Sequence, residues 1–356
     1  MNSLLNKYKT DSFLISLLSI VLGLLCGAVV MLFGGYDPIQ GYYHLFIKIF
    51  GNWYDFGENM RQVTPLILTG LAVAFAFRSG LFNIGVEGQF LMGMTGASLV
   101  AVPFSLPWYI HVPLAIASGA IFGGIWAGIV GFLKARSGIN EVIVCIMFNW
   151  IALFMSNQLI KQFLLEPGQQ RSRMIQDSAS IAIKPLLPFF DNARIHWGML
   201  LAVLCAVFFF VLMWKTTQGY ELRAIGHSQS ASEYAGIKVG WGMVKAMFIS
   251  GAFAGLAGAF EVLGVFQYQS IVNAMPGYGF DGIAVALLGM THPFGVVLSA
   301  FLFGSLTYGS SGMSFGTGAP PEVIRIVFGS IIFFIATQGM FRGMMDKLRH
   351  RRRAGE

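Results

Sequence analysis

The stretch LFNIGVEGQFLMG, residues 81–93, decides the fold. It places Asn83, Glu87 and Gln89 among three glycines, between apolar flanks. The tripeptide NIG interrupts any helix that ends near Arg78, and the apolar run GQFLMGMTGASLVAV restarts one. A polar break of this kind is either a solvated turn or a polar point at membrane depth. The rest of the chain decides between the two.

The composition departs from that of soluble proteins. Of the 356 residues, 56% are hydrophobic and 11% are charged, whereas soluble proteins carry about 25% charged residues. Apolar runs such as 197–214 are long enough to cross a bilayer as helices. The net charge of +7 comes from basic residues in short loops and tails, which favours a membrane orientation over a nucleic-acid partner. Cys26, Cys145 and Cys205 lie inside apolar runs and predict no disulfide framework.

Hydropathy predicts ten membrane elements in a single transmembrane domain, 1–356. The eighth element, GYGFDGIAVALLGM, is short enough to be a half-helix or a re-entrant segment. Ten crossings put both termini and most Lys and Arg residues on the cytoplasmic side, as the positive-inside rule expects. The elements are 12–34, 62–77, 85–101, 112–133, 140–160, 197–214, 244–264, 278–290, 294–309 and 323–341, with an extracellular loop at 161–196, a cytoplasmic loop at 215–243 and a basic cytoplasmic tail at 342–356.

Three pairs of segments match in the same order in the two halves of the chain. Each predicted half has five crossings, an odd number, so the second half inserts upside down relative to the first. Such an inverted-topology repeat is typical of transporters; the alternative is chance similarity among Gly-rich helices. The pairs are GVEG (85–88) with GFDG (279–282), LMGMT (91–95) with LLGMT (287–291), and NEVIVCIMFNWI (140–151) with PEVIRIVFGSII (321–332).

Two roles are open to Glu87. A helix that restarts after a glycine break has unpaired N–H groups and a positive dipole end, which a carboxylate beside the break can cap. We favour this cap; the alternative is polar lining of a translocation path. The same two roles apply to Asp281, its counterpart in the repeat, whereas the mid-span Asn149 is expected to hydrogen-bond a neighbouring helix. The path candidates are Asn83, Glu87, Gln89, Asn149 and Asp281.

The motifs predict no catalytic constellation and no metal site. The six His residues lie at span ends or in loops, without metal-ligand spacing. The sequence has no G-x-x-x-x-G-K-[ST] loop, so we expect the chain to bind no ATP itself. GAFAGLAGAF, 251–260, lies inside a span, and its small residues predict a helix-packing face rather than a nucleotide site.

The loop KTTQGYELRAIGHSQSASEYAGIKVG, 215–240, is long, polar and patterned. A serine in SQSASEYAGI can N-cap a short amphipathic helix with Ala231, Tyr234, Ala235 and Ile237 on one face. Such a helix suits docking in another protein's groove; the alternative is an interfacial helix without a partner. The pattern alone leaves both open.

Several segments resemble a known family. TTQGYELRAIGHSQSASEYAGIKV, followed by SGAFAGLAGAF, closely resembles the cytoplasmic loop and next helix of ABC importer membrane subunits. That branch handles ribose and other simple sugars, nucleosides and branched-chain amino acids. GLFNIGVEGQFLMG, GFDGIAVALLGMTHPFG and GAPPEVIRIVFGSIIF resemble permeases of nucleoside (guanosine-type) importers that work with a basic-membrane-protein type binding lipoprotein. The resemblance covers most of residues 60–341.

The resemblance implies an all-α ABC importer permease with about ten transmembrane elements in a 5+5 inverted repeat. The chain then binds no cofactor, because partner ATPase subunits use the ATP. The other expected partners are a second permease (a paralogue or a second copy), a substrate-binding lipoprotein and the lipid bilayer of the bacterial cell membrane. In that family the loop carries the coupling helix seated in the ATPase, which gives the candidates Arg223, Gly226, Ser228, Ala231, Glu233, Tyr234, Ala235, Gly236 and Ile237.

The expected function is therefore nucleoside uptake by alternating access. Two alternatives stay open: a permease of the same class for ribose or another simple sugar, and a secondary active transporter with inverted repeats. The latter would require a buried charge pair, and Glu87 and Asp281 have no evident basic partner in the sequence. The exact substrate, the identity of the second permease and full crossing by 278–290 also stay open.

Overall fold

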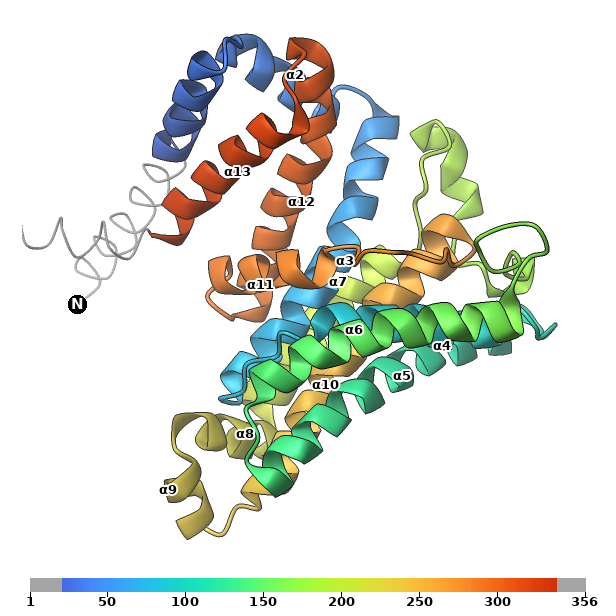
Figure 1. Cartoon of the computed structure of the whole chain (residues 1–356), viewed down its shortest axis with the longest axis vertical. Coiled ribbons are helices and arrows are strands. Elements are labelled where there is room, and N and C mark those ends of the chain that lie inside the picture. The colour runs from blue at the N-terminus through green and yellow to red at the C-terminus, as the bar shows by residue number, and fades with distance from the viewer. Residues whose placement is uncertain (1–20, 338–356) are drawn as a thin grey trace, which may run out of the picture. The chain divides into compact units, whose positions relative to one another are not determined.

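Helices joined by loops with isolated β-bridges make up the computed structural model, which describes residues 21–337. The chain divides into two units, Trp53–Ser305 and a unit formed by the two ends of the chain. The first unit contains α3 (Trp53–Arg78), α4 (Val86–Ala101), α5 (Trp108–Ser137), α6 (Glu141–Leu159), α7 (Gly198–Lys215), α8 (Thr217–His227), α9 (Gln229–Tyr234), α10 (Val239–Phe260), α11 (Tyr278–Leu288), the start of α12 (Pro293–Thr317) and the short 3-10 or π turns η1 (Ile160–Leu164), η2 (Asp177–Ala179), η3 (Lys184–Phe190) and η4 (Glu261–Phe266) (Figure 1).

All ten predicted elements correspond to helices where the structure describes them. Within residues 21–337, six helices are long and apolar enough to cross a membrane, whereas Val21–Phe33 and α11 are shorter. The start of the first predicted element, the end of the last and the tail 342–356 lie outside the described residues. The prediction of a polytopic all-α membrane protein is confirmed.

Some helix boundaries were missed by hydropathy. The helix α3 begins at Trp53 rather than at 62 and continues through Pro65, because its first turns carry polar side chains that a hydropathy window rejects. The helix α2 (Pro38–Phe50) was not predicted, although Asp37 is a clear N-cap. Its carboxylate accepts a hydrogen bond from the Ile39 N–H at 2.8 Å, and proline follows at the first helical position.

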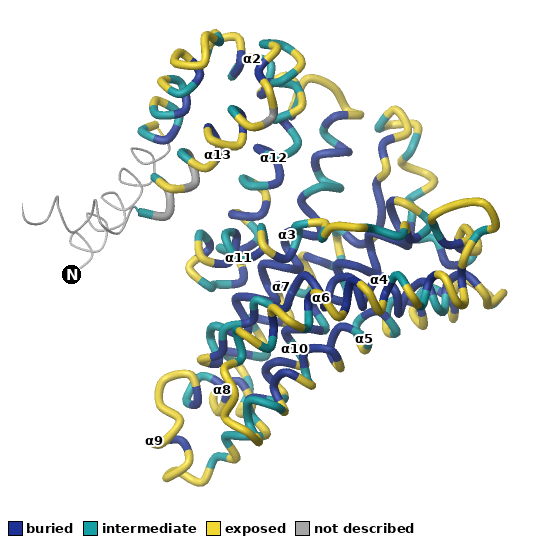
Figure 2. The backbone as a smooth tube through the Cα atoms, viewed as in Figure 1, coloured by how far each residue is buried: buried dark blue, intermediate teal, exposed yellow. Residues whose placement is uncertain are grey.

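Glycines bring α4, α5 and α10 into close contact. A Cβ on Gly255 of α10 would lie 2.3 Å from the Gly119 carbonyl oxygen of α5, and one on Gly93 of α4 would lie 2.3 Å from the Gly255 Cα. Only glycine permits this approach, which increases dispersion contacts between helices where no hydrophobic effect drives association. The packing face predicted for 251–260 is confirmed. Figure 2 shows the resulting core as buried backbone along α3, α4 and α10.

A π turn and an extended segment separate α10 from α11. The helix α10 ends in the π turn η4, and Gln267 then takes the left-handed conformation with φ 60°. Residues 267–277 are mostly non-helical before α11 begins. With 11 residues, α11 is about 16 Å long, roughly half of the ~30 Å hydrocarbon layer. The eighth element, 278–290, is therefore a half-helix preceded by an extended segment.

The unit formed by the chain ends contains the helix 21–33, α2, the rest of α12 and α13 (Pro321–Ala336). The Tyr42 hydroxyl of α2 donates to the Leu24 carbonyl at 2.6 Å. A Cβ on Gly41 would meet both Met31 and Met313, at 2.4 and 3.3 Å. Close packing around α2 thus joins the helix 21–33 to α12 within this unit.

Candidate translocation path and coupling surface

The two half-helices of the repeat begin against each other. The Glu87 carboxylate in the first turn of α4 accepts hydrogen bonds from the N–H groups of Gly277 at 2.6 Å and Gly279 at 2.5 Å. These N–H groups belong to the start of α11, which has no side-chain cap of its own. A Cβ on Gly279 would lie 2.4 Å from the Glu87 backbone nitrogen. One carboxylate therefore lies between two positive helix ends, where it stabilises both.

Glu87 caps a half-helix, as the sequence predicts, but this half-helix is α11 rather than the one that restarts beside Glu87. The first turn of α4 is capped from α6, because Asn149 Oδ1 accepts a hydrogen bond from the Gly88 N–H at 2.8 Å. Asn149 Nδ2 also donates to the Ile84 carbonyl at 3.1 Å. Because Asn149 caps α4, the Glu87 carboxylate can cap the other half-helix, α11, which lies nearly two hundred residues away in sequence.

Reciprocal amide bonds hold the break before α4. Asn83 Nδ2 donates to Gln89 Oε1 and Gln89 Nε2 donates to Asn83 Oδ1, both at 2.9 Å. Asn83 also donates to the Ser250 hydroxyl of α10 at 2.8 Å. Asn83, Glu87 and Gln89 are fully buried and Asn149 is 2% exposed. In this conformation these path candidates fix the backbone break; the fifth, Asp281, is half-buried in the first turn of α11.

From their meeting point, α4 runs to the 161–196 loop, whereas α11 runs to the Arg78 end of α3. The Ala101 carbonyl at the end of α4 accepts a hydrogen bond from the Gln176 N–H of the 161–196 loop at 2.9 Å. At the end of α11, the Met290 and Thr291 carbonyls accept from the Arg78 guanidinium, both at 3.1 Å. Two half-helices that start together and end at opposite faces are what an inverted repeat requires.

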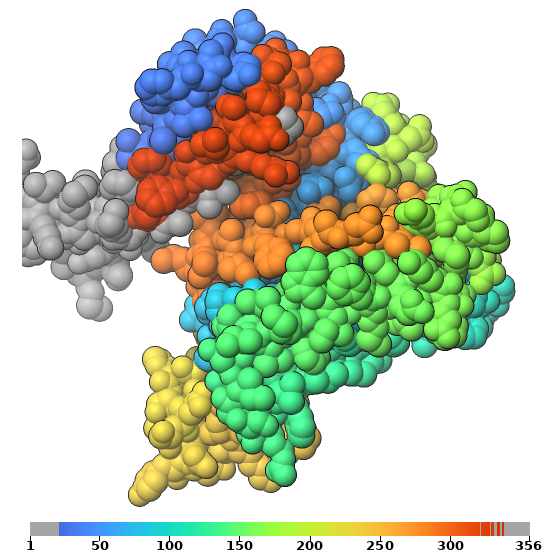
Figure 3. Space-filling model, in the orientation of Figure 1, coloured from blue at the N-terminus to red at the C-terminus, as the bar shows by residue number. Residues whose placement is uncertain are grey.

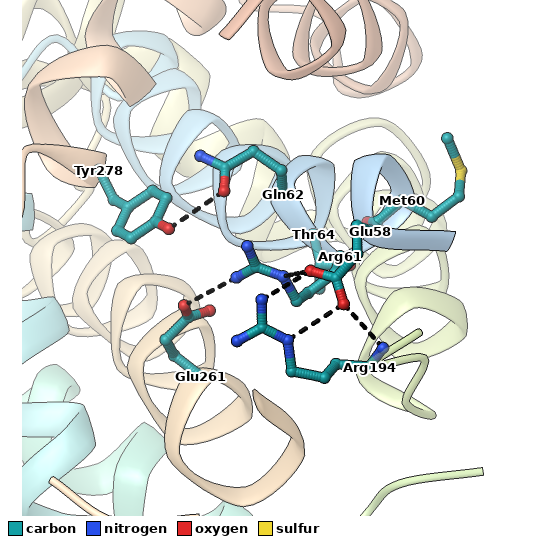
Figure 4. Close-up of polar contacts among 8 residues, drawn as sticks. All are labelled: Glu58, Met60, Arg61, Gln62, Thr64, Arg194, Glu261 and Tyr278. Atoms are coloured by element: carbon teal, nitrogen blue, oxygen red, sulfur yellow. Dashed lines mark hydrogen bonds and ion pairs between the residues drawn. The ribbon is translucent and has the colours of Figure 1, made fainter. Parts of the chain in front are cut away.

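A charge cluster, buried except for the Arg194 side chain, lies at the other end of α3 (Figure 4). Glu58 Oε2 contacts Arg194 Nη2 at 2.7 Å and Arg61 Nε at 2.8 Å, and Glu58 Oε1 accepts from the Arg194 N–H at 2.9 Å. Arg61 Nη1 also lies 3.5 Å from Glu261 Oε1. Tyr278 donates to Gln62 beside them at 3.4 Å. The two carboxylates and two guanidinium groups balance in charge, which makes the burial of Glu58, Arg61 and Glu261 tolerable, while 45% of the Arg194 side chain is exposed.

This cluster was missed by the sequence reasoning, although signals for it exist. Glu261 interrupts the apolar run GAFEVLG inside a predicted span, and an intramembrane carboxylate is a functional candidate by default. Glu58 and Arg61 are three residues apart, a spacing that places them on one helical face. The contribution of Arg194 depends on the fold of the 161–196 loop, and no local pattern predicts it.

The helices α8 and α9 form a hairpin that projects from the first unit at the Arg78 end of α3, shown yellow in Figure 3. As the sequence predicts, a serine caps α9: Ser228 Oγ accepts from the Ala231 N–H at 3.3 Å. Tyr234 is 97% exposed, and Ala231, Glu233, Ala235 and Gly236 are exposed around it. Grooves of ≈ 560 and ≈ 620 Å³ flank the hairpin, and Ile237 lines both.

The base of the hairpin packs against the helix break. A Cβ on Gly80 would lie 2.7 Å from the Gly226 Cα, and one on Gly226 would lie 2.6 Å from the Arg78 carbonyl oxygen. Arg223 is half-buried, and its guanidinium carbon lies 6.0 Å from the Trp214 ring centroid. The side chain predicted to reach a partner therefore lies against α7, at the base of the hairpin.

Broken helices that meet within an apolar bundle, joined to an exposed surface hairpin, define a transport permease of the multi-pass membrane class. The family comparison agrees with this class. Residues 57–336 match the family model of the permease component of branched-chain amino acid transport systems. The chain belongs to this family.

Several relatives carry names that describe transport. The guanosine ABC transporter permease protein NupP of Bacillus subtilis is 49% identical over 96% of this chain and 98% of its own length. The nucleoside ABC transporter permease protein NupB of Lactococcus lactis is 38% identical over 95% of this chain and 94% of its own. A second guanosine permease protein of Bacillus subtilis, NupQ, is 27% identical over 67% of this chain and 76% of its own.

Proposed function

We propose that this chain is the membrane-spanning pathway subunit of an ATP-driven importer of nucleosides. The observation that carries the proposal is the exposed α8–α9 hairpin whose base contacts the break before α4. A separate ATPase dimer drives transport, and this chain hydrolyses no ATP. The names of the relatives NupP and NupB support nucleosides as substrates.

The hairpin is the surface on which the ATPase acts. A short helix that exposes Tyr234, between two grooves, suits insertion into a cleft of another protein. Tyr234 and Ile237 supply apolar contact area, Glu233 supplies a charge at the rim, and Ala231, Ala235 and Gly236 leave room for close approach. Arg223, Gly226 and Ser228 act differently: Arg223 and Gly226 fix the base of the hairpin, and Ser228 fixes α9.

Movement of the hairpin reaches the half-helices through direct contacts. Gly226 contacts Gly80 in the segment that leads to α4, and Glu87 in α4 holds the start of α11. These contacts join backbone atoms directly or through one carboxylate. A movement of the hairpin is therefore passed on to the half-helices with little loss. A shift of the hairpin on ATP binding then changes how the two half-helices meet, as alternating access requires.

The hairpin defines the cytoplasmic side in this proposal. The helix ends near it carry Arg78, Lys134, Arg136, Lys215 and Lys245, in agreement with the positive-inside rule. The protein then lies in the bacterial cell membrane with both termini cytoplasmic, and a binding lipoprotein delivers substrate at the opposite face. Resemblance to both NupP and NupQ of one organism supports a second permease that is a paralogue.

Co-purification and uptake test the proposal. Cells that express this permease with its ATPase, second permease and binding lipoprotein should accumulate radiolabelled guanosine, and the permease should co-purify with the ATPase. The double variant Ala231→Arg, Tyr234→Arg places two charges on the exposed hairpin and should abolish both. Lys184→Ala, a change in a turn of the 161–196 loop, is the matched surface control. Uptake of ribose but not guanosine would reassign the substrate within the class.

The charge cluster at the start of α3 keeps one alternative open to experiment. Glu58, Arg61 and Glu261 supply the intramembrane charge pair that a secondary transporter would require. That mechanism predicts uptake that a protonophore collapses while ATP stays high. Uptake that follows ATP and withstands the protonophore excludes it.

A further inference from the structure

The turn that follows α11 holds two consecutive residues other than glycine in the left-handed conformation. Met290 has φ 52° and Thr291 has φ 53°. This conformation is unfavourable for a residue with a Cβ, and it is rare for a β-branched residue such as threonine. The glycine just before them, Gly289, serves another purpose, because a Cβ on it would lie 2.5 Å from the Val296 nitrogen of α12. The turn is therefore strained, and contacts from outside must hold it.

Arg78, at the end of α3, supplies these contacts. Its Nε donates to the Thr291 carbonyl and its Nη2 to the Met290 carbonyl, both at 3.1 Å. One planar guanidinium thus binds the carbonyls of both left-handed residues, which the compact ammonium group of lysine cannot reproduce. The bond from Nη2 is exposed and the bond from Nε is half-buried. Water can therefore replace the carbonyls if the arginine moves.

The N–H groups of the same turn are bonded back to α11. The Met290 N–H donates to the Leu287 carbonyl at 2.9 Å. The Thr291 N–H donates to the Ala286 carbonyl, also at 2.9 Å. Both bonds require the left-handed turn, since it is this conformation that directs the N–H groups back toward the helix. Exchange of these amide hydrogens with solvent therefore reports whether the turn is held.

Arg78 is also in contact with the α8–α9 hairpin, through its side chain and through its backbone. Its guanidinium carbon lies 5.5 Å from the Trp214 ring centroid, and that of Arg223 in α8 lies 6.0 Å from the same ring. At the backbone, a Cβ on Gly226 would lie 2.6 Å from the Arg78 carbonyl oxygen. A displacement of α8 therefore changes the position of Arg78 relative to the turn.

We propose that this turn, residues 289–292, is a strained latch that Arg78 holds closed at the end of α11, and that movement of the hairpin on ATP binding opens it. The inference rests on the proposed function and goes further, because it assigns a second route from the hairpin to α11. The first route passes through Gly80 and Glu87 to the start of α11. The second passes through Arg78 to its end. With the latch open, the end of α11 can move relative to α3.

Hydrogen exchange in the complete transporter complex tests the latch. The 286–296 peptide should be protected without nucleotide, and ATP with vanadate, which holds the ATPase closed, should speed its exchange at least about tenfold, because two hydrogen bonds from a charged group are lost. Arg78→Lys should exchange fast in both states, and co-purification of the ATPase confirms that this variant is folded. Arg136→Lys, the same change at the exposed end of α5, is the matched control and should respond like the parent protein.

Two substitutions of Met290 test the strain itself. Met290 is 69% exposed, so either variant loses little packing. Met290→Gly removes the Cβ that disfavours the left-handed conformation, whereas Met290→Ala keeps it. The protection factor of the turn amides should therefore be about threefold higher in Met290→Gly than in Met290→Ala. Because the latch then opens less readily, ATP-driven uptake of guanosine should be lower in Met290→Gly than in Met290→Ala.

Three results each overturn the latch: exchange of the 286–296 peptide that ATP with vanadate leaves unchanged, an Arg78→Lys variant that responds like the parent protein, or equal protection in Met290→Gly and Met290→Ala. These results are separate from the proposed function, which fails if the parent complex takes up no nucleoside. A complex that imports guanosine while the turn stays protected refutes the latch alone.

Discussion

Replacing Glu87 by Gln removes one of the two oxygens that hold the start of α11. The carboxylate accepts from the Gly277 and Gly279 N–H groups at 2.6 and 2.5 Å and is fully buried. A hydrogen bond to a charged group contributes about 1.5–3 kcal/mol, and a buried N–H left unpaired costs about 1–3 kcal/mol. The amide keeps one acceptor and turns an NH₂ group toward the other N–H. We therefore expect a loss of about 3 kcal/mol.

Thermal unfolding of the detergent-purified complex measures this loss. The apparent Tm of Glu87→Gln should fall by at least about 5 °C, and guanosine uptake should fall with it because the half-helices no longer meet through a charge. Glu166→Gln is the matched control: its carboxylate pairs with Arg171 at 3.0 Å, and both side chains are about 30% exposed. Such a pair contributes about 0–1 kcal/mol. If the Tm and guanosine uptake of Glu87→Gln equal those of Glu166→Gln, the hydrogen bonds from Glu87 to α11 do not hold the two half-helices together.

Three further predictions concern other parts of the chain. Gly255→Leu should prevent assembly of α4, α5 and α10, seen as loss of the monodisperse peak in size-exclusion chromatography. Gly240→Ala should not, because its added Cβ would lie at an ordinary van der Waals distance of 3.6 Å from the Ala135 Cβ. Burial, with a contribution from the charge of Arg61, lowers the pKa of His196 to about 4, so protonation favours the unfolded state and stability should fall as the pH drops from about 6.5 toward 4. His196→Asn should flatten this pH dependence of the Tm, and an unchanged slope would refute it. Arg194→Ala leaves Glu58 with one cation and should lower the Tm more than Lys184→Ala does.

Hydropathy and the repeat predict most of this fold because each signal is local. Apolar runs locate the spans, and the paired motifs around Glu87 and Asp281 identify two breaks related by inversion. The length of GYGFDGIAVALLGM predicts a half-helix or a re-entrant segment, and the structure has an 11-residue helix there. By contrast, α2 was missed because a hydropathy window averages its apolar face with its polar face, so the mean stays low. Asp37 and Pro38 nevertheless mark its start.

Partners that are distant in sequence could not be predicted. No local pattern shows that Glu87 caps α11 while Asn149 caps α4, because the choice depends on how three helices pack. The same holds for Arg194, which an irregular loop brings to Glu58. Glu261 differs, since a lone carboxylate in an apolar run is visible in the sequence and was overlooked.

Reconstitution into liposomes with the partner ATPase, second permease and binding lipoprotein tests the central proposal most directly. Guanosine should accumulate only when ATP is present on the ATPase side, and the Ala231→Arg, Tyr234→Arg variant should show neither accumulation nor bound ATPase. Accumulation driven by an ion gradient in liposomes that lack the ATPase would contradict the proposal.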